Sequence, residues 1–127
     1  MAFEGEYRKI KAKSEFIRSA NEAWSKDFEI LQTWRKKGQE SEKSQDYLAA
    51  IEFYKICIQH GKGSDFLTLA NYVHDINRII ILYTKTRQIS PLTQLLESLL
   101  LDYPKSLHVA EWQIRLKTIF KDHPKQM

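Results

Sequence analysis

The sequence predicts an all-α fold, and three observations support this prediction. Only four Gly and three Pro interrupt 127 residues, so few positions would break a helix. Apolar residues recur at steps of three, four or seven along most of the chain, which is the spacing of one helix face. The small residues Gly38 and Ala50 lie where two helices could approach closely. A chain of this length is expected to form a single domain, residues 1–127, with a core of its own.

The N-terminal region carries one apolar stripe with helical spacing. No Gly or Pro interrupts residues 6–37. One unusually long helix fits this region, and so do two helices that part near residues 25–27, where Ser25 or Asp27 could cap a new start. We favour the break, which gives an N-terminal helix over residues 1–26. The stripe consists of Tyr7, Ile10, Ile17, Trp24, Phe28 and Leu31.

Two further helices are expected to follow the N-terminal one. The second helix runs from about residue 27 to residue 43, and the polar residues 44–46 separate it from the third. Gly61 and Gly63 are expected to end the third helix, because glycine readily takes the left-handed conformation of a helix terminus. Ser64 then offers a capping oxygen to the next helix.

The second half of the chain predicts three more helices. The fourth spans residues 65–87 and continues through the β-branched residues 79–81, because helical spacing persists on both sides. Ser90 followed by Pro91 indicates the start of a fifth helix that ends at about Asp102.

The last helix completes a set of about six. Tyr103-Pro104 should end the fifth helix, because the residue before a proline avoids the helical conformation. Ser106 can cap the last helix, which should extend to His123-Pro124.

One segment resembles a known helical repeat. Trp34, Gly38, Ala50 and Tyr54 have the spacing of the tetratricopeptide repeat, whose pattern is W-x2-L-G-x2-Y, then A-x3-F, then P. The pairs Asp46-Tyr47 and Ala50-Ile51 are also similar to this family. The sequence departs from the pattern at three positions, which hold Lys37, Ser41 and Lys62.

A fainter second copy follows at Tyr83, Leu92, Leu96 and Pro104. Leu92 lies 42 residues after Ala50, whereas the family repeats every 34 or so residues. The resemblance implies antiparallel helix hairpins in a right-handed superhelical bundle. Its parts would be an N-terminal helix (1–26), a first pair (27–63), a second, divergent pair (64–104), and a capping helix with a tail (105–127).

Charge and cysteine content narrow the classes of function. The formal net charge is +4, but residues 1–46 hold ten Lys or Arg and nine Asp or Glu, and residues 47–127 hold ten and seven. Such mixed charge indicates a hydrated surface rather than a dedicated nucleic-acid face. The single Cys57 cannot form an internal disulfide, and the first residues lack the pattern of a secretory signal. We therefore expect a cytoplasmic protein without a membrane span.

The candidate catalytic residues do not converge. Four His and one Cys show no metal-ligand spacing, so we expect no metal or cofactor. His60 near a helix C-terminus would interact favourably with the helix dipole, and the neighbours His74 and Asp75 point about 100° apart on a helix. Arg115 and His123 approach the spacing of a class of helical ribonucleases but miss it by one residue. We expect no enzyme activity.

The function predicted is that of a non-catalytic protein–protein interaction module, an adaptor or regulator that binds a peptide or helix of a partner. As the resemblance implies, the first helix of each pair would line a concave groove. Polar side chains on that side could hold an acidic or C-terminal peptide. They are Gln32, Arg35, Gln39, Lys43, His74, Asn77 and Arg78.

Two questions stay open from the sequence. Basic residues could contact phosphates and make this a nucleic-acid-associated helical protein. A stack of two helix pairs also leaves an apolar face uncovered at each end. The N-terminal stripe and the last helix could cap these ends within the monomer, which we favour, or the stripe could pair with a second chain in a homodimer, because its steps are nearly heptad. The basic residues are Arg8, Lys9, Lys11, Lys13 and Arg18, with Lys117, Lys121 and Lys125 near the C-terminus.

Overall fold

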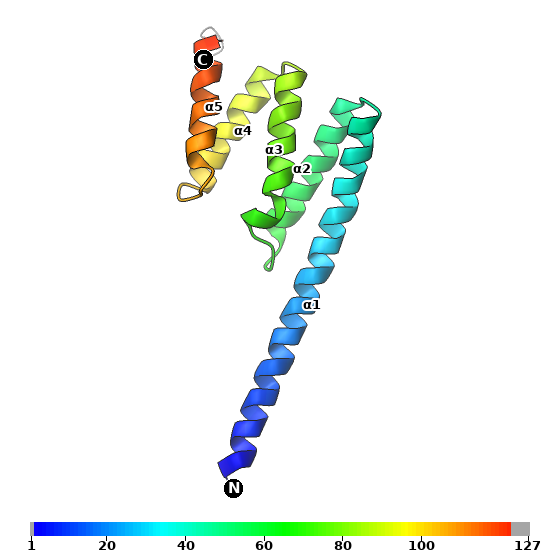
Figure 1. The fold of residues 1–127 in the computed structure, drawn as a ribbon, viewed down its shortest axis with the longest axis vertical. Helices are drawn as coiled ribbons and strands as arrows, with labels where there is room; N and C mark the ends of the chain where they lie inside the picture. The colour runs from blue at the N-terminus through cyan, green and yellow to red at the C-terminus, as the bar shows by residue number, and fades with distance from the viewer. Residues whose placement is uncertain (1, 123–127) are drawn as a thin grey trace. The chain divides into compact units, whose positions relative to one another are not determined.

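The described part of the chain consists of helices and their connections. The structure is a computed structural model that describes the backbone of residues 2–122 and the side chains of residues 4–122. Within this range it contains no strand, which confirms the all-α prediction. Five helices follow one another along the chain (Figure 1): α1 (Ala2–Lys43), α2 (Tyr47–Gly63), α3 (Leu69–Lys85), α4 (Ile89–Asp102) and α5 (Val109–Asp122).

The chain divides into two compact units, Met1–Ile76 and Asn77–Met127, and the boundary falls inside α3. None of the helices described combines the length and the apolarity that crossing a bilayer requires.

α1 is a single helix of 42 residues, so the predicted break near residues 25–27 is wrong. For the same reason the structure has five helices over residues 2–122 rather than about six. Asp27, one of the two residues considered as a cap for a new helix, instead accepts a hydrogen bond from the hydroxyl of Ser64, with 2.6 Å between the oxygens. Its carboxylate therefore ties α1 to the end of α2, and nothing interrupts α1 at this point.

α1 and α2 form an antiparallel hairpin whose backbones approach closely (Figure 1). Gly38 and Ala50 are both buried. A Cβ built on Gly38 would lie 2.9 Å from the Tyr54 ring, so only glycine fits there without a shift. Trp34 stacks on Phe53 with 6.1 Å between the ring centroids. The prediction that small residues allow a close helix crossing is confirmed at Gly38.

The two ends of α2 differ in how well the sequence predicted them. α2 starts at Tyr47, directly after the break predicted at residues 44–46. Asp46 caps this start and accepts a hydrogen bond from the amide of Ala49 at 3.2 Å. α2 ends at Gly63, as predicted. No described glycine has a positive φ, so the predicted left-handed conformation of the terminating glycine is wrong. Gly61 instead gives room to Tyr72, since a Cβ there would come 2.3 Å from the Tyr72 ring.

α3 begins at Leu69 rather than at residue 65. The hydroxyl of Ser64 accepts hydrogen bonds from the amides of Phe66 and Leu67, both at 3.1 Å. Because Ser64 organises this turn, the helix starts only after it.

Two non-glycine residues take the left-handed conformation that the sequence analysis assigned to glycines. Gln45 follows α1 with φ 62°, and Arg87 follows α3 with φ 57°. After α1, the amide of Asp46 donates to the carbonyl of Ser41 at 2.9 Å. After α3, the amide of Gln88 donates to the carbonyl of Tyr83 at the same distance. Both ends therefore have the hydrogen bonds of a Schellman motif.

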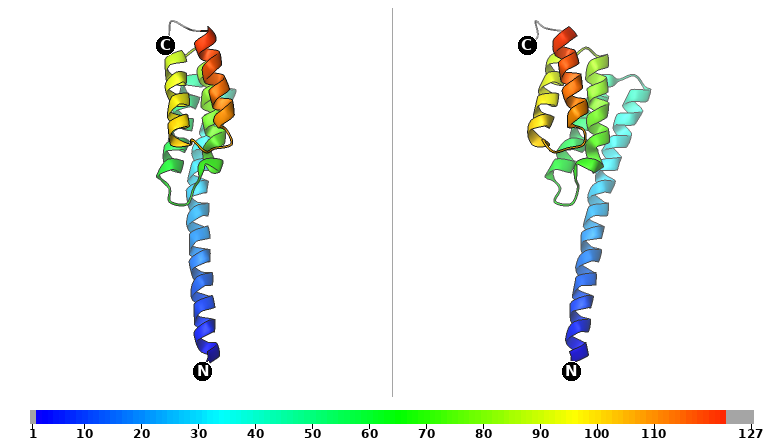
Figure 2. Two further views of the ribbon diagram at one scale, coloured as in Figure 1. Left: turned by 90° about the vertical axis from the view of Figure 1, so that its left-hand side faces the viewer. Right: turned by 60° about the vertical axis from the view of Figure 1, so that its left-hand side comes forward.

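The second unit contains the rest of α3 together with α4 and α5, which pack side by side (Figure 2). The triplet at residues 79–81 is helical, as predicted. α4 starts at Ile89, so Ser90 lies within its first turn rather than at its cap. α4 ends at Asp102 as expected, and the predicted end of α5 at His123-Pro124 lies outside the described residues. The buried apolar side chains of this unit are Ile79, Ile80, Leu82, Tyr83, Leu92, Leu96, Leu99, Trp112 and Ile119.

Candidate protein-interaction surfaces

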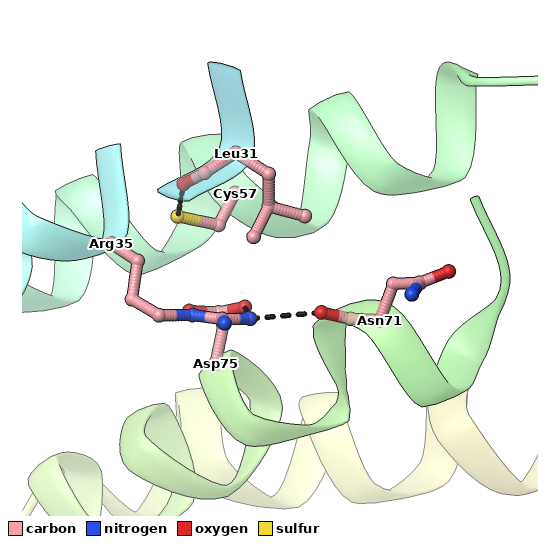
Figure 3. Close-up of polar contacts among 5 residues, drawn as sticks. All are labelled: Leu31, Arg35, Cys57, Asn71 and Asp75. Atoms are coloured by element: carbon pink, nitrogen blue, oxygen red, sulfur yellow. Dashed lines mark hydrogen bonds and ion pairs between the residues drawn. The ribbon is translucent and has the colours of Figure 1, made fainter. Parts of the chain in front are cut away.

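Arg35 and Asp75 form a buried ion pair between α1 and α3 (Figure 3). Nε of Arg35 donates to Oδ1 of Asp75 at 2.9 Å, and Nη2 donates to Oδ2 at 2.7 Å. Nη2 also donates to the carbonyl of Asn71 at 2.8 Å. Asp75 is fully buried, whereas the side chain of Arg35 keeps 17% of its surface exposed. This two-point contact fixes the start of α3 against α1.

Cys57 lies beside this ion pair in the core of the first unit (Figure 3). Its thiol donates to the carbonyl of Leu31, with 3.5 Å between Sγ and oxygen. Burial, and secondarily the negative charge of Asp75, raise the pKa of Cys57 to about 12. The hydrogen bond to Asp75 raises the pKa of Arg35. Cys57 is therefore a protonated core residue at neutral pH.

The ion pair gives Arg35 a different role from the one predicted. The sequence predicts that this guanidinium holds a partner's carboxylate, but the carboxylate of Asp75 in the same chain takes this position. Asp75 was considered only as a neighbour of His74. The one sequence signal for its burial is its place between Tyr72 and Ile76, two positions of an apolar helix face that are both buried.

The other predicted groove residues fall into two sets. Gln32, Gln39 and Lys43 are exposed and share one face of α1, as their spacing of seven and four residues requires. His74 is exposed on α3, and Asn77 and Arg78 are half-buried on the same helix but belong to the second unit. The structure thus joins Arg35 to α3 and leaves three neighbours on α1 open to solvent.

A groove that the sequence analysis did not predict lies within the second unit. It has a volume of about 290 Å³ and is lined by residues of α3, α4 and α5. Five of its nine lining residues are apolar, and the other four carry hydroxyl or charged groups. The apolar residues are Ile80, Ile89, Leu92, Ile114 and Ile119, and the polar ones are Thr84, Arg115, Thr118 and Asp122.

The first half of α1 leaves apolar side chains in solvent. Every residue from 4 to 19 is exposed. Tyr7 is 67% exposed, Ile10 65% and Ile17 49%. The prediction that this stripe caps the bundle within the monomer is therefore wrong for these residues, whereas Leu31 at the end of the stripe is fully buried.

The histidines have separate, local surroundings. Nε2 of His60 lies 2.8 Å from the carbonyl oxygen of Asp27, which links α2 to α1. His74 is exposed, and the ring of His108 lies 5.7 Å from that of Trp112. His123 lies outside the described residues, so the structure does not test the spacing between Arg115 and His123. Among residues 2–122, no three His, Cys, Asp or Glu side chains come together as metal ligands would.

The basic residues considered for phosphate binding are exposed where they are described. Arg8, Lys9, Lys11, Lys13 and Arg18 are exposed on α1, and Lys117 and Lys121 on α5. Lys125 lies outside the described range.

Comparisons of the chain with protein families, curated proteins and solved structures identify no related protein. No protein-family model matches the chain, and neither curated proteins nor solved structures give a significant match.

Proposed function

We propose that this chain is a non-catalytic protein–protein interaction module, acting in the cytoplasm as an adaptor or regulator. The observation that carries the proposal is the groove of the second unit, an apolar trough of about 290 Å³ between helices. Apolar grooves between helices suit an amphipathic partner helix or an extended peptide, whose apolar side chains enter the groove. Polar groups on the rim then fix the orientation of the bound segment.

The composition of the groove supports a peptide rather than a reactive substrate. Ile114 lines the groove and is 65% exposed, so its side chain is accessible to a bound segment. Arg115 forms an ion pair with Glu111 on its own helix at 3.6 Å, and Asp122 lies on the same rim. Cationic and anionic groups at one rim suit a partner segment of mixed charge.

The resemblance to tetratricopeptide repeats extends the proposal to the first unit. Within this unit, Gln32, Gln39 and Lys43 on the polar face of α1 would contact the partner directly, and so would His74 on α3. Asn77 and Arg78 are proposed as partner contacts within the second unit. Arg35 would act by holding α3 against α1 through Asp75 rather than by binding the partner.

The test is capture of binding partners by variants that change one surface at a time. Ile114→Glu places a charge in the groove and should abolish capture of specific partners from a cell extract. Leu107→Glu is the matched control, because Leu107 is 98% exposed in the same unit and does not line the groove. A peptide recovered from the captured partner should bind the purified wild-type chain and lose affinity only for the Ile114 variant.

Equal capture by both variants would rule out the groove. The double variant Gln39→Glu/Lys43→Glu tests the polar face of α1 in the same experiment. Selective loss of capture there would move the binding site to the first unit.

The alternative function, association with nucleic acid, is favoured by one observation. The first half of α1 carries five exposed Lys and Arg residues, which are Arg8, Lys9, Lys11, Lys13 and Arg18. Binding through them should weaken steeply as salt rises. It should also be lost when Arg8, Lys9, Lys11 and Lys13 are replaced by Ala.

A further inference from the structure

The first half of α1 is a helix without a partner inside its own unit. Asp27 is the first residue of α1 for which a contact with the end of α2 is described. Residues 2–26 therefore extend beyond the hairpin (Figure 1), over about 37 Å at 1.5 Å per residue. Apolar side chains held this far from the core indicate a surface that another helix covers.

The exposed apolar residues follow a heptad register. Ile10, Ile17 and Trp24 are spaced by seven residues and occupy d positions, as does the buried Leu31. Tyr7 occupies an a position, and so does Phe28. Heptad repeats of apolar residues at a and d produce the seam of a coiled coil of two or more helices. The seam of α1 runs from residue 7 to residue 27 and then continues into the core of the hairpin.

The remaining a positions indicate which helix pairs with the seam of α1. They hold Ser14 and Asn21, both exposed. A polar residue at an a position is unfavourable against an apolar partner, but Asn opposite an identical Asn is satisfied across the two-fold axis of a parallel dimer. A second copy in parallel orientation places Asn21 opposite Asn21 and Ser14 opposite Ser14. We propose that two copies of this chain associate through α1 as a parallel, two-stranded coiled coil.

The flanking charges favour the parallel orientation over the antiparallel one. In the parallel dimer Glu6 at a g position faces Lys11 at an e position of the second copy, which is an attractive pair. Lys13 faces Arg18, and this pair is repulsive. The antiparallel alternative has no attractive pair, because Lys11 would face Arg18 and Glu6 would face Asp27.

The seam itself also disfavours the antiparallel arrangement. The same alignment sets Ile10 opposite Asn21 and Ile17 opposite Ser14, which leaves polar groups against apolar ones. The two polar a layers weaken the parallel dimer as well. Association should therefore depend on protein concentration. Dimerisation through α1 does not depend on partner binding in the groove of the second unit, so each proposal can be tested separately.

The experiment measures the mass of the full chain by sedimentation equilibrium across a wide concentration range. The wild-type chain should approach twice its mass of 15.1 kDa as concentration rises. The double variant Ile10→Asp/Ile17→Asp should stay monomeric at every concentration. Both residues are exposed in the monomer, so the fold should survive, and circular dichroism checks that it does.

Phe16→Asp is the matched control. Phe16 is adjacent to Ile17 and more exposed, at 74%, but it lies off the seam. This variant should dimerise like the wild-type chain. Equal loss of dimer in both variants would contradict a specific seam, and a wild-type chain that stays monomeric would overturn the proposal. A monomer that binds anionic vesicles or nucleic acid through α1 would overturn it too.

The orientation is tested with Tyr7→Cys. Parallel pairing places the two introduced thiols in one layer, so mild oxidation should give a disulfide-linked dimer. Buried Cys57 should not compete. A variant that dimerises but does not cross-link would exclude the parallel arrangement. Loss of partner capture in Ile114→Glu alongside normal dimerisation would leave this inference intact.

Discussion

Arg35 and Asp75 set the geometry of the first unit at the level of single residues. Their contact places opposite charges from α1 and α3 in a site where Asp75 has no access to solvent. A buried ion pair adds little stability relative to an apolar pair of similar shape, but removal of one partner leaves an uncompensated charge. The main effect of this pair is therefore to fix the position of α3 against α1, through two residues that lie 40 positions apart in the sequence.

We predict an asymmetric cost when this pair is broken. Arg35→Met leaves the carboxylate of Asp75 buried without a counter-charge and should lower the free energy of unfolding by about 3–5 kcal/mol. Asp75→Asn should cost less, because the partly exposed Arg35 can reach water. Chemical denaturation of the two variants and of Arg35→Met/Asp75→Leu measures these differences.

The double variant provides the control. It should be more stable than Arg35→Met alone, since no charge remains buried. Additive losses in the double variant would show that the two side chains are not coupled, and they would contradict the observed ion pair.

Cys57 should make stability depend on pH in the alkaline range. In the unfolded chain its thiol ionises near pH 9, whereas burial raises its pKa to about 12 in the folded state. The folded state thus retains a proton that the unfolded state loses. The contribution to the free energy of unfolding is complete below pH 9 and falls as pH rises toward 12.

Between pH 8 and pH 10 this loss should be about 1.4 kcal/mol. Lys and Tyr residues also titrate in this range, so the comparison is with Cys57→Ala, which contains the same Lys and Tyr residues. The stability difference between the two proteins should shrink by that amount in urea unfolding. Parallel pH profiles would show that the thiol ionises freely in the folded protein.

At the scale of elements, glycines decide how closely α2 packs in its unit. Gly38 and Gly61 each face an aromatic ring at a distance that leaves no room for a methyl group, whereas Gly63 has nothing within 4 Å of a built Cβ. All three lie in helices with negative φ. Their substitution therefore tests packing rather than backbone conformation.

The stability lost on substitution by alanine should increase as the space for a methyl group at each glycine decreases. Gly38→Ala should lower the free energy of unfolding by about 1–3 kcal/mol through overpacking against Tyr54. Gly61→Ala should cost more, because its contact with Tyr72 is shorter. Gly63→Ala should have no cost and could stabilise α2 by up to about 1 kcal/mol. Thermal and urea unfolding measure the series, and a loss at Gly63 equal to that at Gly38 would contradict the packing argument.

At the scale of the whole molecule, local patterns predicted the helices better than the contacts between them. Helical spacing correctly carried α3 through residues 79–81, and Asp46 marked the start of α2. These features depend on neighbours in sequence. Gly38 was also predicted well, because its spacing from Ala50 already describes a helix crossing.

The errors in the prediction arose where a side chain binds a residue distant in sequence. Asp27 has the chemistry of a helix cap, and only its bond to Ser64, 37 residues later, shows that it serves another purpose. Gly61 fits a helix terminus equally well until Tyr72 is placed against it. Arg35 looked available for a ligand because nothing local reveals Asp75 as its partner. The groove of the second unit was missed for a similar reason, since three helices contribute to it.

The two proposed interaction surfaces, the groove and the α1 seam, are each confined to one unit of the chain. Each presents apolar groups that the chain itself leaves exposed. The α1 seam makes the more specific claim, because its polar layers and flanking charges specify the second copy and its orientation.

The most direct test is the distance between spin labels on two copies of α1. Gly5→Cys offers an open site for the label, on the outer side of the proposed coiled coil. Parallel pairing predicts one distance of about 20–30 Å, set by two helix diameters side by side. A distance of about 40 Å or more, or no defined distance at a concentration where dimers should form, would contradict the account.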